Sequence, residues 1–414
     1  IPNPGFSGTQ WDPKYEFKAV GLLAVAFGMV GLDRFIINPL FPVIAKDLGL
    51  SYQDLGFISA VLALTWGIAS IFAGRLSDRI GRKKVLIPAV VAFSILVAGS
   101  GLATGLISLL VIRCLMGVAE GAFVPASIVS TVEASKPSRV GLNIGIQQMA
   151  APLVGLGLGP IIAIGMLKVV PNWHWVFGVV AIPGLILAFA MAKVLRNDIP
   201  NHAITITGKP AAWWEVLRYR NVIFNTLGMF CWLSCLIVLS AFMPNYLTDY
   251  LKLNMDQMSL VLTGLGIGSF SGMLFLPAIS DKLGRKPVIL VSLAIEIVGL
   301  CLLTRIGAEP ISLFAVLFVV TFMNAGVVAI TVGPLTSDSV PRHLASSATG
   351  IVVGLGEVVG GAVAPAAAGI VAQNFGIVNI PYIALGAIVL GFIVAAIGVK
   401  EPKPLFTVHS LATF

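Results

Sequence analysis

Charged side chains are scarce in this sequence. Lys, Arg, Asp and Glu make up 11% of its 414 residues, whereas hydrophobic residues make up 57%, and an average soluble domain is roughly a quarter charged. So little charge cannot cover a globule in water, which excludes an ordinary soluble domain. The formal charge of +8 does not indicate a nucleic-acid partner, because the basic residues occur in short loops rather than along one polar face.

Cysteine and histidine are also rare. Cys114, Cys231, Cys235 and Cys301 all fall inside apolar runs, without the spacing of a zinc site or of a secreted disulfide framework, so we expect them to pack as small hydrophobes. The sequence shows no phosphate-binding loop, catalytic triad, metal cluster or cleavable leader. We therefore expect no enzymatic activity, no metal and no organic cofactor, and the first apolar segment is read as a retained span.

Long apolar runs take the place of the missing charge. A helix that crosses a bilayer needs about 20 mostly apolar residues, and charged clusters, Pro and Gly separate twelve such segments. They are expected at 18–44, 54–75, 84–104, 106–133, 140–168, 173–195, 221–250, 256–279, 287–305, 309–338, 344–373 and 377–399. The sequence thus predicts an all-α, multi-pass protein of the cell membrane with twelve transmembrane helices, surrounded by lipid and expected to be a monomer.

The loops predict the orientation. With the N-terminus in the cytoplasm, twenty Lys and Arg residues fall on the inside and only Lys46, Lys168, Lys252 and Arg305 on the outside. Cytoplasmic loops of membrane proteins carry this excess of positive charge. Because one missed span would invert every later loop, the bias also supports an even number of spans. Both termini are predicted to be cytoplasmic.

The two halves of the chain repeat each other. Residues 74–84 (GRLSDRIGRKK) recur as residues 277–286 (PAISDKLGRK), a shift of 203 residues from Asp78 to Asp281. The predicted domains are therefore an N-terminal six-helix bundle (1–196), a cytoplasmic linker (197–220) and a C-terminal six-helix bundle with a short tail (221–414). Six spans per half give a parallel repeat, a plan in which substrate binds near the midplane between the halves.

The repeated loop motif, with its Asp-x2-Gly-Arg-Lys spacing, resembles that of the major facilitator superfamily. The resemblance covers the whole chain and implies the fold of that family. It also implies a conformational latch at the cytoplasmic side, in which acids cap helix ends and pair with Arg. The residues expected in the latch are Asp78, Arg82, Glu133, Asp281, Arg285 and Asp338. The alternative is that these charges serve only to orient the chain.

Three further stretches are similar to the anion:cation symporter family within that superfamily. They are Asp33-Arg34 with the preceding Leu32, the pattern Arg113-x3-Gly117-x2-Glu120-x4-Pro125, and residues 172–177 (NWHWVF). The resemblance implies uptake of organic anions such as sugar acids, together with protons or sodium.

Two acids and two bases fall at membrane depth in the first half. Asp33 and Arg34 lie halfway along the first span, and Arg113 and Glu120 are seven residues apart on the fourth, about 10 Å along one helical face. Charge in the bilayer costs at least ~2.5–3.5 kcal/mol per residue and is functional by default. The other interpretation is a static salt-bridge cluster that holds the bundle together.

An anion symporter needs a cationic ligand and acids whose proton affinity depends on the substrate. Arg offers paired donors for a carboxylate, and we expect Arg34 to bind the substrate, with Arg113 as the structural partner of the acids. When substrate engages Arg34, Asp33 or Glu120 loses counter-charge, so that substrate and proton favour each other's binding. We expect these two acids to carry the proton.

The second half offers other candidates. Glu357, in the glycine-rich eleventh span, is expected to be a second proton site, a sodium ligand, a partner for a cationic or amide group of the substrate, or a buried structural residue. Glu296 in the ninth span is expected to be structural. Neutral polar residues that either contact substrate or only satisfy neighbouring backbone groups are Asn38, Gln147, Gln148, Trp232, Asn245 and Asn324.

The leading hypothesis is therefore proton-coupled symport of a small organic anion by alternating access, with sodium as a possible substitute for the proton. A second hypothesis is proton-coupled export of a drug-like or lipophilic compound, since residues 155–165 partly resemble the Gly-Pro motif of drug antiporters. Spinster-like transporters of lipids or organic anions carry a similar Asp-Arg pair and Gly-x2-Glu pattern. The paired charges argue against a scaffold or receptor that transports nothing.

Overall fold

The structure, a computed structural model, describes residues 11–196, 213–341 and 344–401. Within these ranges the chain is helical and contains no strand. Twelve helical segments are long and apolar enough to cross a membrane, which confirms the predicted number of spans. These segments are Pro13–Leu48, Tyr52–Ala73, Lys83–Ser100, Leu106–Ala134, Val140–Leu167, Trp173–Val194, Arg220–Tyr250, Met255–Leu283, Arg285–Leu303, Pro310–Leu335, Ser347–Phe375 and Ile377–Gly398.

Several spans are broken into shorter elements. The N-terminal half contains α1 (Pro13–Phe35), α2 (Ile37–Leu48), α3 (Tyr52–Ile80), α4 (Lys83–Ser100), α5 (Leu106–Ala134), α6 (Val140–Ala151), the π-helix η1 (Pro152–Leu158), α7 (Gly159–Leu167) and α8 (Trp173–Val194). The C-terminal half contains η2 (Trp213–Arg218), α9 (Arg220–Asn245), η3 (Tyr246–Tyr250), α10 (Met255–Leu283), α11 (Arg285–Leu303), α12 (Pro310–Ile330), η4 (Thr331–Leu335), α13 (Ala345–Gly356), η6 (Glu357–Val363), α14 (Ala364–Phe375), η7 (Ile377–Asn379) and α15 (Ile380–Gly398). Of the predicted linker, residues 197–212 lie outside the described residues.

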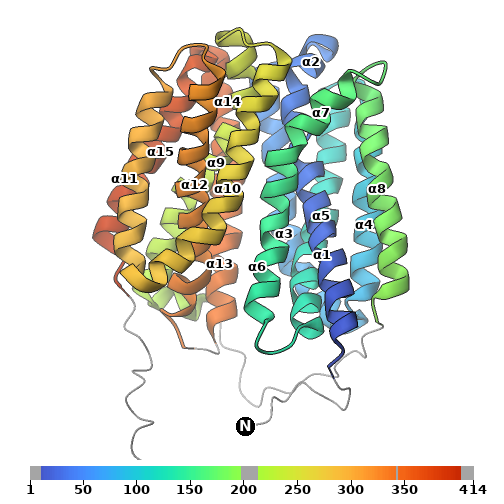
Figure 1. Cartoon of the computed structure of the whole chain (residues 1–414), viewed down its shortest axis with the longest axis vertical. Coiled ribbons are helices and arrows are strands. Elements are labelled where there is room, and N and C mark those ends of the chain that lie inside the picture. Colours follow the sequence, from blue (N-terminus) through green and yellow to red (C-terminus); the bar gives the residue numbers. More distant parts are fainter. Residues whose placement is uncertain (1–10, 197–212, 342–343, 402–414) are drawn as a thin grey trace, which may run out of the picture.

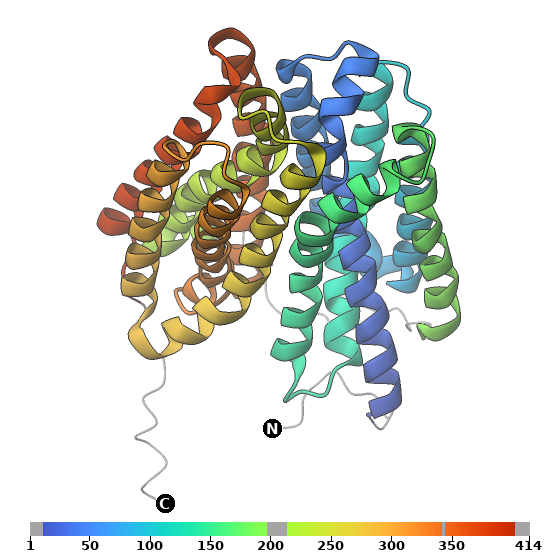
Figure 2. The same cartoon turned by 45° about the horizontal axis from the view of Figure 1, so that its top comes forward.

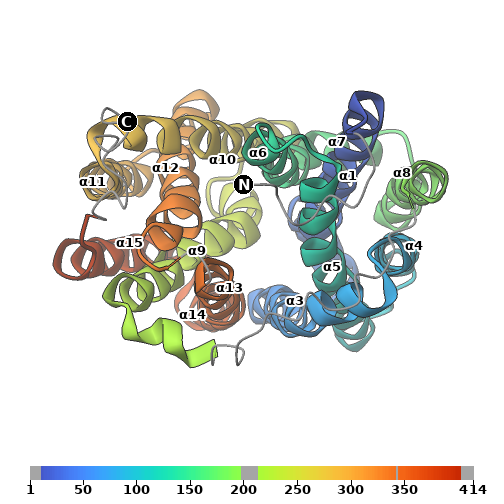
Figure 3. The same cartoon turned by 90° about the horizontal axis from the view of Figure 1, so that it is seen from below.

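The spans form two bundles that lie side by side, one from each half (Figures 1 and 3). They meet where α3 packs on α14, η1 on α10, and α2 on α9. Because the number of spans is even, α1 begins and α15 ends at the same face, which we call the terminal face. The opposite face, where α2, α7 and α14 reach the top of Figure 1, is called the far face. This arrangement places the end of α1 and the middle of the eleventh span beside the seam between the halves.

The first span breaks at Ile36, between α1 and α2. Pro39 explains the break, because proline has no N–H to donate to the carbonyl of Phe35 and its ring clashes with that residue. The last carbonyls of a helix have no partner within it. The break therefore leaves carbonyl groups at Asp33 and Arg34 that another element must satisfy inside the membrane.

At the terminal face, α1 begins behind a charged cap. The Asp12 side chain accepts hydrogen bonds from the amides of Lys14 and Tyr15, and its carboxylate pairs with Arg196 at 2.6 Å. The Tyr15 amide, with the Lys14 amide and Arg196, lowers the pKa of Asp12 below its ordinary value. The cap thus ties the start of the first span to the end of the sixth.

Close backbone contact joins the halves near the middle of the membrane. A Cβ atom added to Gly266 on α10 would lie 1.9 Å from the backbone nitrogen of Gly157 on η1. No side chain fits in that space, so glycine at position 266 is required for the two bundles to approach this closely.

The far face comes forward in Figure 2, and polar links join the halves toward this face. The Tyr52 hydroxyl donates to Asp249 at 2.9 Å, the Tyr52 amide donates to Gln373 at 3.2 Å, and Lys168 pairs with Asp256 at 2.5 Å. Among ion pairs between described residues, the other one that joins the halves is Arg34–Glu357. The observed polar links therefore hold the halves together from mid-membrane to the far face.

Candidate functional site

An ion pair between the halves lies at the centre of the candidate site. The Arg34 Nη2 atom, in the last turn of α1, lies 2.9 Å from Oε2 of Glu357, the first residue of η6. The two side chains are 14% and 11% exposed. An added Cβ at Gly361 would lie 2.6 Å from that same Oε2 atom, so the glycine leaves room for the carboxylate. Sequence reasoning singled out both residues without pairing them.

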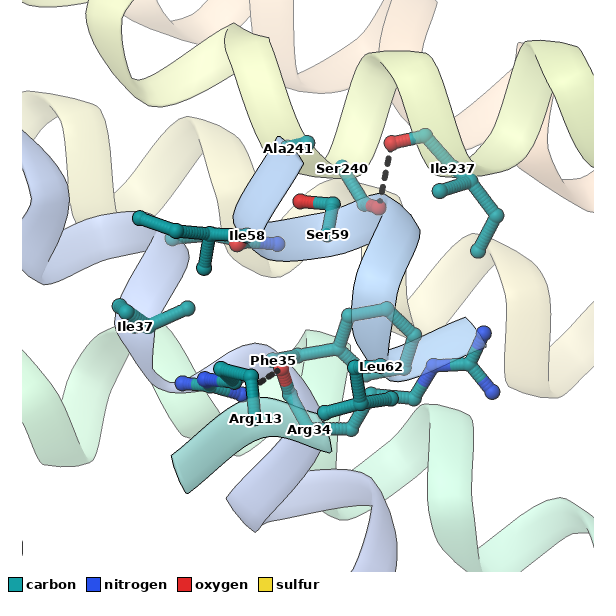
Figure 4. A pocket seen from close by; sticks show the side chains of 11 residues that line it. Arg34, Phe35, Ile37, Ile58, Ser59, Leu62, Arg113, Ile237, Ser240 and Ala241 are labelled. Atoms are coloured by element: carbon teal, nitrogen blue, oxygen red, sulfur yellow. Dashed lines mark hydrogen bonds between the residues drawn. The ribbon is translucent and has the colours of Figure 1, made fainter. Parts of the chain in front are cut away.

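Two aromatic rings flank the Arg34 guanidinium. Its central carbon lies 5.5 Å from the ring centre of Phe35 and 5.8 Å from that of Trp66, within the range of a cation–π contact. Toward the far face, a cavity of about 20 Å³ is lined by residues that include Asn38, Ser59 and Arg34 (Figure 4). A cavity of this size holds about one water molecule. The far side of Arg34 is therefore closed to anything larger.

Arg113 holds the break in the first span. Its Nη1 atom donates to the carbonyl oxygens of Asp33 and Arg34, at 3.3 and 3.1 Å; Figure 4 shows the second contact. The side chain is 1% exposed. The guanidinium thus satisfies the two carbonyls that the break leaves open, instead of forming a close ion pair with an acid.

Asp33 and Glu120 lie close to this contact but have unsatisfied oxygens. They are 1% and 0% exposed, and neither Oδ1 of Asp33 nor either carboxylate oxygen of Glu120 has a hydrogen-bond partner among the described residues. The same holds for the Nε and Nη2 atoms of Arg113. Buried charges without direct partners are costly. The two carboxyl groups therefore stand outside the hydrogen bonds that Arg113 makes.

The neutral polar candidates are spread over several places. Asn38 lines the small cavity, and Gln148 is half-buried on α6. Gln147 is fully buried and accepts a hydrogen bond from Thr131 at 2.9 Å. Asn245 donates to Asp249 at 2.9 Å, beside the link to Tyr52. Of these four, Asn38 lines the small cavity together with Arg34.

A separate buried cluster occupies the C-terminal bundle. Asn324 donates to Glu296 at 2.8 Å and to the carbonyl of Trp232 at 3.2 Å, and the Cys235 thiol contacts Glu296 at 3.4 Å. Glu296 and Trp232 are fully buried. These contacts use the amide nitrogen of Asn324 and Oε1 of Glu296, whereas Oδ1 of Asn324 and Oε2 of Glu296 have no hydrogen-bond partner among the described residues.

The two loop motifs make matching contacts. Arg82 pairs with Glu133 at 3.1 Å in the N-terminal half. In the C-terminal half, Arg285 pairs with Asp281 and lies 3.8 Å from Asp338. The side chain of Asp78 lies outside the described residues. The structure thus brings each motif arginine to the acid that ends the fourth span of its half.

Other contacts were not predicted from sequence. Lys83 donates to the carbonyl of Leu195 at 2.7 Å and Lys286 to that of Ala396 at 2.9 Å, so each motif lysine caps the end of its half's last helix. The duplication of the loop motif is the sequence signal from which these matching lysine contacts could have been predicted. No comparable signal marked the Tyr52–Asp249 link, because it joins residues 197 positions apart. Among the described residues, no cluster of His, Cys, Asp and Glu could hold a metal.

Comparison with known proteins agrees with this geometry. A family model described as the Major Facilitator Superfamily matches residues 23–252 and 226–410. A hexuronate transporter of Bacillus subtilis (strain 168) is 30% identical over 62% of this chain and 62% of its own, and the sialic acid transporter NanX of Escherichia coli (strain K12) is 27% identical over 87% and 90%. A gentisate transporter of Corynebacterium glutamicum is 26% identical over 87% and 82%. The matched part of the hexuronate transporter is thus under two thirds of its length.

A solved structure has a similar fold. It is the crystal structure of a bacterial homolog of the human lysosomal transporter Spinster, in an inward-facing and unoccupied conformation. The TM-score is 0.76 at 14% identity, over 95% of this chain and all of that one. At this identity the likeness concerns the fold alone.

Proposed function

Since the chain belongs to the Major Facilitator Superfamily, we propose that it is a secondary active transporter that takes up a small organic anion together with protons. The relatives with organic acids in their names, a hexuronate and sialic acid among them, support a carboxylate as substrate. Sugar acids and aromatic acids are the first compounds to test.

The ion pair between Arg34 and Glu357 carries this proposal. A guanidinium at mid-membrane is costly and therefore indicates a function. Arg34 lies between the halves, where substrate binds in parallel-repeat transporters. The Arg34 side chain is 14% exposed, whereas Arg113 is buried and donates hydrogen bonds to main-chain carbonyls. Arg34 is therefore the cation that is free to exchange its partner for a substrate carboxylate.

The way in which the halves are joined supports alternating access. The excess of Lys and Arg in loops at the terminal face supports a cytoplasmic location for that face. The described polar links between the halves lie from mid-membrane to the far face. A substrate would then exchange with the cytoplasm in this conformation, and breaking the far-face links would open the other side.

Coupling to protons is assigned to Asp33 and Glu120. A substrate carboxylate on Arg34 takes up positive charge that otherwise acts on these acids, so proton binding and substrate binding support each other. Both acids are buried and have oxygens without partners.

The test is uptake of labelled glucuronate, sialic acid and gentisate into proteoliposomes under an inward proton gradient. Arg34→Ala is expected to abolish uptake, and Arg34→Lys to keep a small part of it because the charge remains but the paired donors are lost. Glu120→Gln is expected to keep exchange of substrate across the membrane and to lose gradient-driven accumulation. Proton release on adding a lipophilic cation, with no uptake of any acid, would instead indicate an exporter.

A further inference from the structure

The charges at mid-membrane depth do not balance. Around Arg34 the described residues place two guanidinium groups, Arg34 and Arg113, and three carboxyl groups, Asp33, Glu120 and Glu357. The four groups of the N-terminal half balance one another. Glu357, supplied by the other half, adds a negative charge to a region where uncompensated charge is costly.

Glu357 depends on Arg34 for its counter-charge. Besides α13 and α14 of its own span, the elements packed against η6 are α3 and α9. Near η6, α3 presents Ala63 and Gly67, and α9 presents Leu233. None of these three is titratable, and among the described residues Arg34 is the charged group that faces the Glu357 carboxylate.

A substrate carboxylate must compete for the same guanidinium. If the substrate carboxylate replaces Glu357 on Arg34, the site holds two carboxylates and one cation between them. The Glu357 carboxylate is then the group without a partner. Once it has bound a proton, the Glu357 carboxyl group is neutral and can donate a hydrogen bond. Binding of the anion to Arg34 and binding of a proton to Glu357 are therefore coupled, in addition to the proton held by Asp33 and Glu120.

We propose that Glu357 carries a proton of its own, so that each monovalent anion moves with two protons instead of one. This inference rests on the proposed function of proton-coupled anion uptake. The N-terminal acids supply the first proton and Glu357 supplies the second. Glu357 is thus a proton-binding residue of the C-terminal half, not only a tie between the halves.

The stoichiometry has a measurable electrical consequence. One proton with one monovalent anion moves no net charge, so membrane potential does not affect transport. Two protons with one anion move one positive charge inward, and an inside-negative potential then drives uptake. At zero potential and a gradient of one pH unit, the accumulation limit rises from about 10-fold to about 100-fold, since each proton contributes a factor of ten.

The experiment uses the full-length protein in proteoliposomes with labelled glucuronate, a monovalent anion. A potassium gradient with valinomycin sets the potential, and internal and external buffers set the pH. We expect uptake in the wild type to be driven by potential alone at equal pH. Glu357→Gln, which cannot ionise, should lose this dependence, keep uptake driven by the pH gradient, and keep exchange of internal for external substrate.

Two variants serve as controls. Glu296→Gln changes the other buried acid of the C-terminal half, which faces Asn324 rather than Arg34, and should retain potential-driven uptake. Glu357→Asp keeps an ionisable group and should also retain it. If Glu357→Gln yields no active protein, the accumulation ratio of the wild type decides, because a limit near 10-fold overturns the proposal and a limit near 100-fold supports it.

The outcomes separate the two proposals. Uptake that ignores the pH gradient in the wild type contradicts proton coupling itself. Uptake that follows the pH gradient but not the potential leaves the proposed function intact and refutes the second proton. Potential-driven uptake that persists in Glu357→Gln, or that requires sodium, also refutes the assignment to Glu357.

Discussion

Replacing Arg113 by methionine should destabilise the protein strongly. Methionine keeps an unbranched apolar stem but is shorter and has no charge and no donor. The change leaves the carbonyl oxygens of Asp33 and Arg34 without the Nη1 donor that they share. It also removes one of the two guanidinium groups whose charge acts on the buried acids Asp33 and Glu120.

The expected loss is about 3–5 kcal/mol. A hydrogen bond from a charged donor contributes about 1.5–3 kcal/mol, and Arg113 makes two with main-chain carbonyls. Breaking a buried charge interaction from one side costs about 3–5 kcal/mol, and the two effects overlap because one group supplies both. The through-space attraction to Glu120 is smaller, about 2 kcal/mol at the ~10 Å that seven residues span along a helix and an effective dielectric constant of ~20. The contacts with the first span should therefore dominate.

The assay is thermal unfolding of the purified protein, followed by intrinsic fluorescence. For a chain of this length 1 kcal/mol shifts Tm by roughly 1–2 °C, so Arg113→Met should lower Tm by about 3–10 °C. Arg113→Lys is the matched control; it keeps the charge but has a single amine, and we expect an intermediate loss.

A double-mutant cycle with Glu120→Gln separates the two causes. If the carbonyl contacts dominate, removing the acid restores no more than about 2 kcal/mol. Full recovery in the double variant would show that Arg113 acts as a counter-ion, and an unchanged Tm in Arg113→Met would refute both accounts.

Three further predictions concern the frame of the site. Gly266→Ala should cost about 1–3 kcal/mol and lower Tm, because the new Cβ would lie 1.9 Å from the Gly157 nitrogen; an unchanged Tm would show that the halves separate freely there. Tyr52→Phe removes the hydrogen bond to Asp249. This bond contributes about 1 kcal/mol, so its loss should shift the population roughly five-fold toward states open at the far face. A cysteine placed on that face should then be labelled faster, and an unchanged labelling rate would argue against a gating role. Asp12→Ala should lower Tm at neutral pH. The pKa of Asp12 is lower in the folded than in the unfolded state. Asp12 therefore stabilises the fold fully at a pH above its unfolded-state pKa, and this stabilisation disappears as pH falls through its folded-state pKa. The Tm values of variant and wild type should thus converge in acid.

Much of the candidate site could be found from sequence because charge is rare in the membrane. Asp33, Arg34, Arg113 and Glu120 were recognisable as charges inside apolar runs, and Glu357 for the same reason. Their contacts were not. Arg113 donates hydrogen bonds to main-chain carbonyls, because the break at Ile36 leaves acceptors there, and its partnership with the acids stays a prediction. The neutral polar residues were the least predictable, since a buried Asn or Gln has the same sequence signal whether it contacts substrate or, like Asn324, a neighbouring side chain.

The sequence alone determined the number of spans, most of their boundaries and the duplication of the two halves. These properties are local, because each span must supply its own apolar length and satisfy its own backbone hydrogen bonds in lipid. The tertiary structure decided which charges meet. Arg34 and Glu357 are 323 residues apart, and the packing of one bundle against the other is what brings them to 2.9 Å. That contact joins the two halves at the point where a substrate would bind, and no periodicity or motif within either half encodes it.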